Sequence, residues 1–149
     1  MNAQSSSPAS QGKGKVVRTL SKGLPILWTL VPELPDQAGR LATPWLVIIS
    51  WTYDGSVAGG MPSEEVNQGM LGLADTLGKI ERPAFCHEAY RRVGCGLREF
   101  VFYVSDRNQF MLELNDLLAE HPRYPIEIKF FEDPEWSELK QLIGDLKLG

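Results

Sequence analysis

The sequence is poor in the residues from which many catalytic and metal sites are built. It holds two cysteines and two histidines among 149 residues. Cys86 and Cys95 could in principle pair, but a chain of this length can bury a proper core without a disulfide, so we expect free thiols. No histidine or cysteine spacing resembles a metal site. We therefore expect no metal and no cofactor.

Long apolar runs and an excess of positive charge are also missing. No run approaches the length of a bilayer span, and the first residues lack the apolar region of a secretory signal. The net charge is −4 and the isoelectric point is about 5.2, which argues against non-specific binding to nucleic acid or anionic membranes. These features predict a cytoplasmic protein whose partner is another protein or a second copy of the chain.

Two segments are instead apolar at odd and even positions alike, residues 44–51 and residues 100–104. A strand with water on one face alternates in polarity, whereas a strand buried on both faces does not. The two segments therefore predict central strands of a sheet that is covered on both sides.

The remaining elements follow from turn, capping and periodicity signals. We expect residues 1–22 to form a flexible tail and residues 23–149 to form a single domain. Residues 33–43 are typical of a loop, and residues 94–96 of a tight hairpin turn. Predicted edge strands cover residues 25–32, 84–93 and 124–131, and predicted helices begin near residues 62, 105 and 134.

From residue 45 onward this order is β-α-β-β-α-β followed by a last helix, with one extra strand in front. Such an order is typical of the ferredoxin-like α+β sandwich. Its strands lie in the spatial order fourth, first, third, second, which places the two wholly apolar segments in the middle. The C-terminal helix is the expected cover of the second sheet face, and a dimer partner is the alternative.

None of the chemical constellations in the chain predicts catalysis. Cys86 and His87 are neighbours in a strand, so their side chains should point to opposite faces. The glycine-rich loop at residues 55–60 lacks the lysine of a phosphate-binding loop. Asp54 and Asp106 end antiparallel strands and should lie at opposite ends of the sheet. The aromatic strand at residues 96–103 resembles that of RNA-recognition domains, but a covering helix would make its aromatics core residues.

One end of the predicted sheet is a candidate contact surface. The fold should bring together the loop 54–62, the turn 94–96 and the segment 121–124. We interpret this end as a rim that could bind a partner protein or a small anionic ligand. The residues that we expect to form it are Asp54, Arg92, Arg98, Arg123 and Tyr124.

Four short motifs carry a resemblance to a known family. They are Asp54-Gly55 after an apolar strand, residues 61–65 (Met-Pro-Ser-Glu-Glu), the hairpin at residues 94–103 and residues 133–136 (Asp-Pro-Glu-Trp). Over about residues 25–146 the chain resembles the bacterial family catalogued as domain of unknown function 695, a resemblance that implies no catalytic residue. The Asp-Gly turn and the predicted topology are also remotely similar to the family of regulator of ribonuclease E activity B, small acidic proteins that bind and inhibit a ribonuclease.

The absence of a nucleophile, acid/base pair or metal set favours a non-catalytic regulatory or protein-interaction module, with the edge strands and the rim as contact surfaces. The alternative is a small-ligand-binding protein or an enzyme that uses the loop end of the sheet, for which the glycine-rich loop, Arg98 and Tyr103 are the sequence support.

Overall fold

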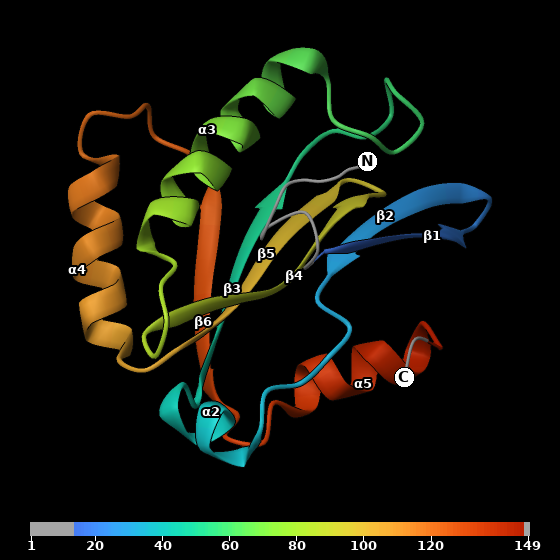
Figure 1. Ribbon diagram of the computed structural model, residues 1–149. Coiled ribbons are helices and arrows are strands. Elements are labelled where there is room, and N and C mark those ends of the chain that lie inside the picture. Colours follow the sequence, from blue (N-terminus) through green and yellow to red (C-terminus); the bar gives the residue numbers. More distant parts are fainter. Residues whose placement is uncertain (1–13, 148–149) are drawn as a thin grey trace, which may run out of the picture.

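The computed structural model describes residues 14–147, so the predictions made for residues 1–13 lie outside the described residues. This part of the chain forms one antiparallel sheet in the order β1-β2-β4-β5-β3-β6, with helices on both faces (Figure 1). The strands are β1 (Lys15–Ser21), β2 (Leu24–Leu30), β3 (Trp45–Thr52), β4 (Cys86–Gly94), β5 (Leu97–Val104) and β6 (Ile126–Glu132). The helices are α2 (Gln37–Ala42), α3 (Glu64–Ile80), α4 (Arg107–Leu118) and α5 (Ser137–Asp145).

The two wholly apolar segments are β3 and β5, and they lie side by side at the centre of the last four strands. Their register places Ile49 opposite Phe100, and β6 and β4 flank them on either side. Side chains of one parity, such as Ile49 and Phe102, pack with α3 and α4. Side chains of the other parity, such as Leu46 and Val101, pack with α5. The α+β prediction and the predicted order of these four strands are therefore confirmed.

Helices α3 and α4 begin at the caps that the sequence indicates. The Ser63 side chain accepts from the amide of Val66, and two glutamates occupy the first turn of α3, where the helix dipole favours negative charge. Asp106 caps α4 in the same way, accepting from the amide of Gln109. The buried face of α3 consists of Met70, Leu73, Thr76, Leu77 and Ile80.

The β4–β5 hairpin turns through Cys95 and Gly96, whose φ angles are +52° and +79°. Gly94, just before them, lies so close to β2 that an added Cβ would be 2.5 Å from the Pro25 carbonyl oxygen. Further along β4 the register shifts between Glu88 and Tyr90, which makes a β-bulge at Ala89.

Strand β1 corrects the prediction of a flexible tail over residues 15–22. It pairs with β2 along its whole length, from Lys15 opposite Leu30 to Ser21 opposite Leu24. Lys22 and Gly23 form the two-residue turn at positive φ. Backbone pairing rather than apolar burial holds most of β1 in place. The composition of these residues therefore does not indicate a strand.

Three further expectations are corrected. Strand β2 was predicted at an edge but lies between β1 and β4, and β4 likewise lies between β2 and β5. The predicted loop at 33–43 contains the short helix α2, which Asp36 caps through the amide of Gly39. Helix α5 begins at Ser137 rather than at residue 134, because Trp136 adopts a left-handed conformation (φ 58°, ψ 40°) that interrupts the first helical turn.

Candidate functional site

The motif at residues 133–136 anchors α5 to the sheet. The Asp133 carboxylate accepts from the amides of Ser137 and Glu138 at 2.8 and 3.0 Å, and from the Tyr103 hydroxyl at 2.7 Å. The Trp136 indole stacks on the Tyr103 ring with centroids 4.0 Å apart and planes 6° apart. Its Nε1 donates to the carbonyl oxygen of Thr43 at 3.1 Å. These contacts give the motif a structural role.

The predicted rim is partly assembled at one end of the sheet. The loop after β3 contacts the β4–β5 turn through the Tyr53 amide, which donates to the Gly96 carbonyl at 3.0 Å, and the Gly96 amide, which donates to the Gly60 carbonyl at 3.1 Å. Tyr124 packs against Trp51 of β3 with ring centroids 5.3 Å apart. The three predicted segments thus lie at the same end of the sheet.

The side chains of the five rim residues do not converge. Asp54 is exposed and accepts from the amide and hydroxyl of Ser56, which closes a local turn. Arg92 lies on the α5 face, 5.5 Å above the Trp28 ring. Arg98 is buried on the opposite face, paired in register with Trp51.

The other two rim residues line a shallow cavity of about 370 Å³. Arg123 is exposed there, and the Tyr124 hydroxyl lies 2.8 Å from Nδ1 of His121. Binding of a partner or an anionic ligand at the rim stays a prediction.

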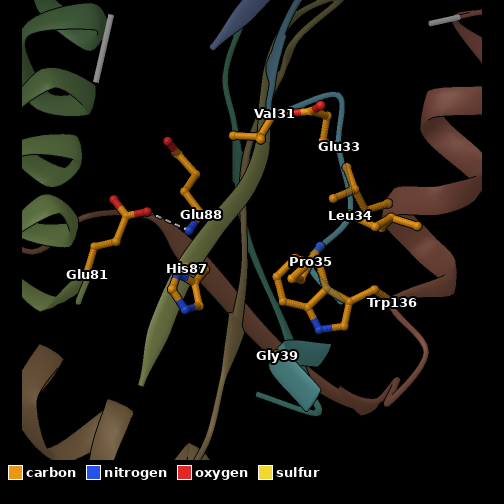
Figure 2. A pocket seen from close by; sticks show the side chains of 10 residues that line it. Val31, Glu33, Leu34, Pro35, Gly39, Glu81, His87, Glu88 and Trp136 are labelled. Atoms are coloured by element: carbon orange, nitrogen blue, oxygen red, sulfur yellow. Dashed lines mark hydrogen bonds between the residues drawn. The ribbon is translucent and has the colours of Figure 1, made fainter. Parts of the chain in front are cut away.

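A more apolar pocket lies at the place where β2 ends. Beyond the last β2–β4 pair, the Val31 amide donates to the Ala89 carbonyl, and the chain then continues through Pro32 and Pro35. Within the described residues, the beginning of β4 therefore has no strand on its β2 side. The resulting pocket has a volume of about 340 Å³ (Figure 2). Its lining consists of Val31, Glu33, Leu34, Pro35, Gly39, Glu81, His87, Glu88, Trp136 and Leu139.

Carboxylates surround this pocket. Figure 2 shows Glu81 beside the start of β4, where its Oε2 accepts from the Glu88 amide at 2.9 Å. The Glu88 carboxylate pairs with Arg91, accepting from Nε at 2.9 Å and from the terminal nitrogen at 3.0 Å. Burial raises the pKa of Glu88, and Arg91 opposes that shift. Glu33 is exposed.

The face of the sheet that carries α3 and α4 is open over β1 and β2. Figure 1 shows both helices over the β3 and β6 side, whereas the β1–β2 hairpin extends from the other side of the sheet. Register places Val16, Arg18 and Leu20 of β1 and Leu27 of β2 on this face. We call these four residues the open face. Val16 is 68% exposed, Leu20 62% and Leu27 37%.

Neither thiol forms a disulfide, and Cys86 and His87 point to opposite sheet faces as expected. Cys86 lies in the core beneath α3 and α4, where burial raises the pKa of its thiol. The His87 ring is 6.5 Å from that of Trp136 on the α5 face. Within residues 14–147, histidine, cysteine and carboxylate side chains form no group of three that could hold a metal ion. In the same part of the chain, no helix combines the length and apolar content needed to cross a membrane.

Comparison with known proteins decides the family. The model of a family described as "Family of unknown function (DUF695)" matches residues 15–142. The chain belongs to this family. The match begins at the first residue of β1 and ends within α5, so this DUF695 chain contains the whole six-stranded sheet inside the matched region. No curated protein and no solved structure matches it significantly, and the remote similarity to regulator of ribonuclease E activity B stays a prediction.

Sequence reasoning missed both the pocket and the open face of this DUF695 chain. The pocket exists because β2 ends before β4 does, and Pro32 and Pro35 were the signal for that early end. The open face depends on β1, for which Lys22-Gly23 between two strand-like segments was the signal.

Proposed function

We propose that this chain is a non-catalytic regulatory or protein-interaction module and that the open face is the surface that contacts its partner. The observation that carries the proposal is the exposure of Val16, Leu20 and Leu27 on one side of a two-stranded extension. Contiguous exposed apolar side chains are typical of surfaces that contact another macromolecule. In the sheet formed by residues 14–147, β1 is also an edge strand, where a partner strand or helix gains backbone or side-chain contacts.

Charge on and beside the open face favours a partner segment that carries carboxylates among apolar residues. Arg18 lies opposite Leu27 in the register and is exposed. Further inward on the same face, Arg98 is only 9% exposed, and its Nε has no hydrogen-bond partner among the described residues. Burial lowers the pKa of Arg98, Arg91 adds to this shift, and Glu88 opposes it. The Glu88 carboxylate is hydrogen-bonded to Arg91 rather than to Arg98. Burying a guanidinium is costly, so a carboxylate from an acidic partner would stabilise this region.

The alternative of an enzyme or ligand binder at the loop end has less support. Its two main residues, Arg98 and Tyr103, differ in parity along β5 and point to opposite faces. Tyr103 is buried and bonded to Asp133. The cytoplasmic location and the ferredoxin-like relationship belong to the proposal as well, supported by the two free thiols and by the order of the last four strands.

Site-specific photocrosslinking in cells of the native host tests the proposal. A photoreactive amino acid replaces Leu20 in one variant and Leu112 in the control. The two positions are matched, since Leu20 is 62% and Leu112 65% exposed. We expect a discrete crosslinked protein from position 20 and none from position 112, with the crosslinked peptide rich in aspartate or glutamate. The Arg18→Glu substitution should weaken that crosslink.

Three results would overturn this reading. Equal crosslinking at positions 20 and 112 would mean that the crosslinks depend only on how exposed a position is and not on a specific contact surface. Crosslinking to a second copy of the chain would replace the acidic partner by a homodimer. No crosslink at position 20 under conditions in which the folded variant accumulates would remove the open face as a contact surface.

A further inference from the structure

The pocket at the end of β2 has the shape and lining of a small-ligand site. Ligand pockets are concave, largely apolar and usually about 300–1,000 Å³ in volume, and this one has a volume of about 340 Å³. It occupies the position that a continued β2 would fill beside β4. We propose that it binds a small organic cation, namely a primary ammonium group on an aromatic or aliphatic body.

The walls of the pocket account for the apolar body of such a ligand. Val31, Leu34 and Pro35 form one side, and Trp136 and Leu139 of the α5 region form another. Figure 2 shows Trp136 and Pro35 next to each other and facing the start of β4. Trp136 and Leu139 are buried and fixed in the core around α5, so this part of the pocket is preformed.

The charges around the pocket account for the ammonium group. Among residues 14–147 the lining contains the carboxylates of Glu33, Glu81 and Glu88 and no lysine or arginine. Two of the arginines near the pocket are engaged by other groups, while Arg98 acts on Glu88 from a greater depth in the sheet. Arg91 pairs with Glu88, and Arg40 donates to the carbonyl of Pro35 and lies 3.8 Å from Glu135.

Two carboxylates thus remain for a ligand. Oε1 of Glu81 and both oxygens of Glu33 accept no hydrogen bond from the described residues, whereas Oε2 of Glu81 is held by the Glu88 amide. A cation in the pocket would therefore be attracted without displacing an existing pair, and an anion would be repelled.

A titration of the full chain followed by amide NMR shifts tests the proposal. The probes are 2-phenylethylammonium, its neutral analogue 2-phenylethanol and its anionic analogue phenylacetate, which share one aromatic body. We expect saturable shifts at residues 31–35, 86–88 and 136–139 with the ammonium probe. We expect binding about tenfold weaker for the alcohol, because hydrogen bonds to charged groups are the stronger ones, and none for the carboxylate.

Charge-neutralising variants separate the carboxylates from the apolar walls. Glu81→Gln retains an oxygen that can accept from the Glu88 amide. Glu33→Gln removes the charge of an exposed side chain that forms no hydrogen bond with a described residue, so both variants should fold. Each should weaken the ammonium probe several-fold and leave the alcohol unchanged. Glu120→Gln, an exposed carboxylate outside the pocket lining, is the matched control and should change neither.

The inference fails if the ammonium probe gives no saturable shifts, or if its shifts map outside the pocket. It fails equally if the alcohol binds as tightly as the ammonium, or if Glu33→Gln and Glu81→Gln together leave the affinity unchanged. None of these results bears on the open face, so the two proposals are tested separately.

Discussion

Replacing Asp133 by alanine should detach the start of α5 and destabilise the protein. The carboxylate holds two backbone amides at the start of this helix and accepts from Tyr103. Loss of a capping side chain costs about 1 kcal/mol. Leaving the buried Tyr103 hydroxyl without its acceptor adds about 1–3 kcal/mol. The free energy of unfolding should therefore fall by about 2–4 kcal/mol.

Urea unfolding followed by far-ultraviolet circular dichroism measures this change, provided that the dependence of the free energy on urea is the same in all variants. Tyr103→Phe should cost about 1 kcal/mol, because Asp133 keeps its two amides. The double variant should cost about 2–4 kcal/mol less than the sum of the single ones, since it leaves no unpaired hydroxyl and loses the shared hydrogen bond only once. Asp116→Ala, at an exposed position of α4, is the control and should change stability by about 0.5 kcal/mol or less.

Two outcomes would refute this account of the motif. A loss of less than about 0.5 kcal/mol in Asp133→Ala, which is the range of ordinary surface substitutions, would mean that the carboxylate does not hold α5. Additive costs in the double variant would mean that Tyr103 and Asp133 act independently, despite the 2.7 Å between their oxygens.

Two further predictions concern a pair of glycines and an exposed ion pair. Gly94→Ala should cost about 3 kcal/mol, because its Cβ would meet the β2 backbone at positive φ, whereas Gly78→Ala in α3, with nothing within 4 Å of the added Cβ, should stabilise by about 1 kcal/mol. Thermal unfolding of both variants checks this prediction. A change of melting temperature in the same direction in both variants would contradict it. Hydrogen bonds from Arg82 and Gln109 lower the pKa of Glu113 from 4.5 to about 2. The resulting stabilisation is fully present above pH 4.5 and is lost as the pH falls toward 2. The Glu113→Gln variant should therefore lose less stability than the wild type between pH 4.5 and 2. If the free energy of unfolding falls equally with pH in both proteins, the Glu113 carboxylate does not contribute to stability in this way.

The central part of the fold could be predicted because its signals are local and agree with one another. The uniform apolarity of β3 and β5, the cap at Ser63 and the glycines of the β4–β5 turn each indicate a structure that the topology also requires. Helix α5 was placed three residues early for a physical reason. The Asp133 carboxylate reaches past a turn to the amides of Ser137 and Glu138, so a capping residue in the sequence need not adjoin the helix that it caps.

The peripheral features could not be predicted because they depend on relations between distant segments. Strand β1 contains Val16 and Leu20 at positions that stay exposed, so its pattern carries little burial signal. The pocket depends on how far β2 extends along β4, which is a property of register rather than of either sequence alone. Arg92 and Arg98 looked like neighbours on one rim, yet alternation along a hairpin sends them to opposite faces.

The bulge at Ala89 determines which layer of the molecule receives each residue of β4 beyond it. A single extra residue reverses the inside-outside phase of a strand. Because of the bulge, the Tyr90 side chain lies on the α5 side, where its hydroxyl donates to the Glu138 carboxylate. Arg91 points to the other side and pairs with Glu88. Without the extra residue, alternation from Cys86 onward would turn Arg91 toward α5 and Tyr90 away from it. The extra residue thus brings Tyr90 and Arg92 to the α5 side of the sheet and leaves Arg91 on the side of Glu88.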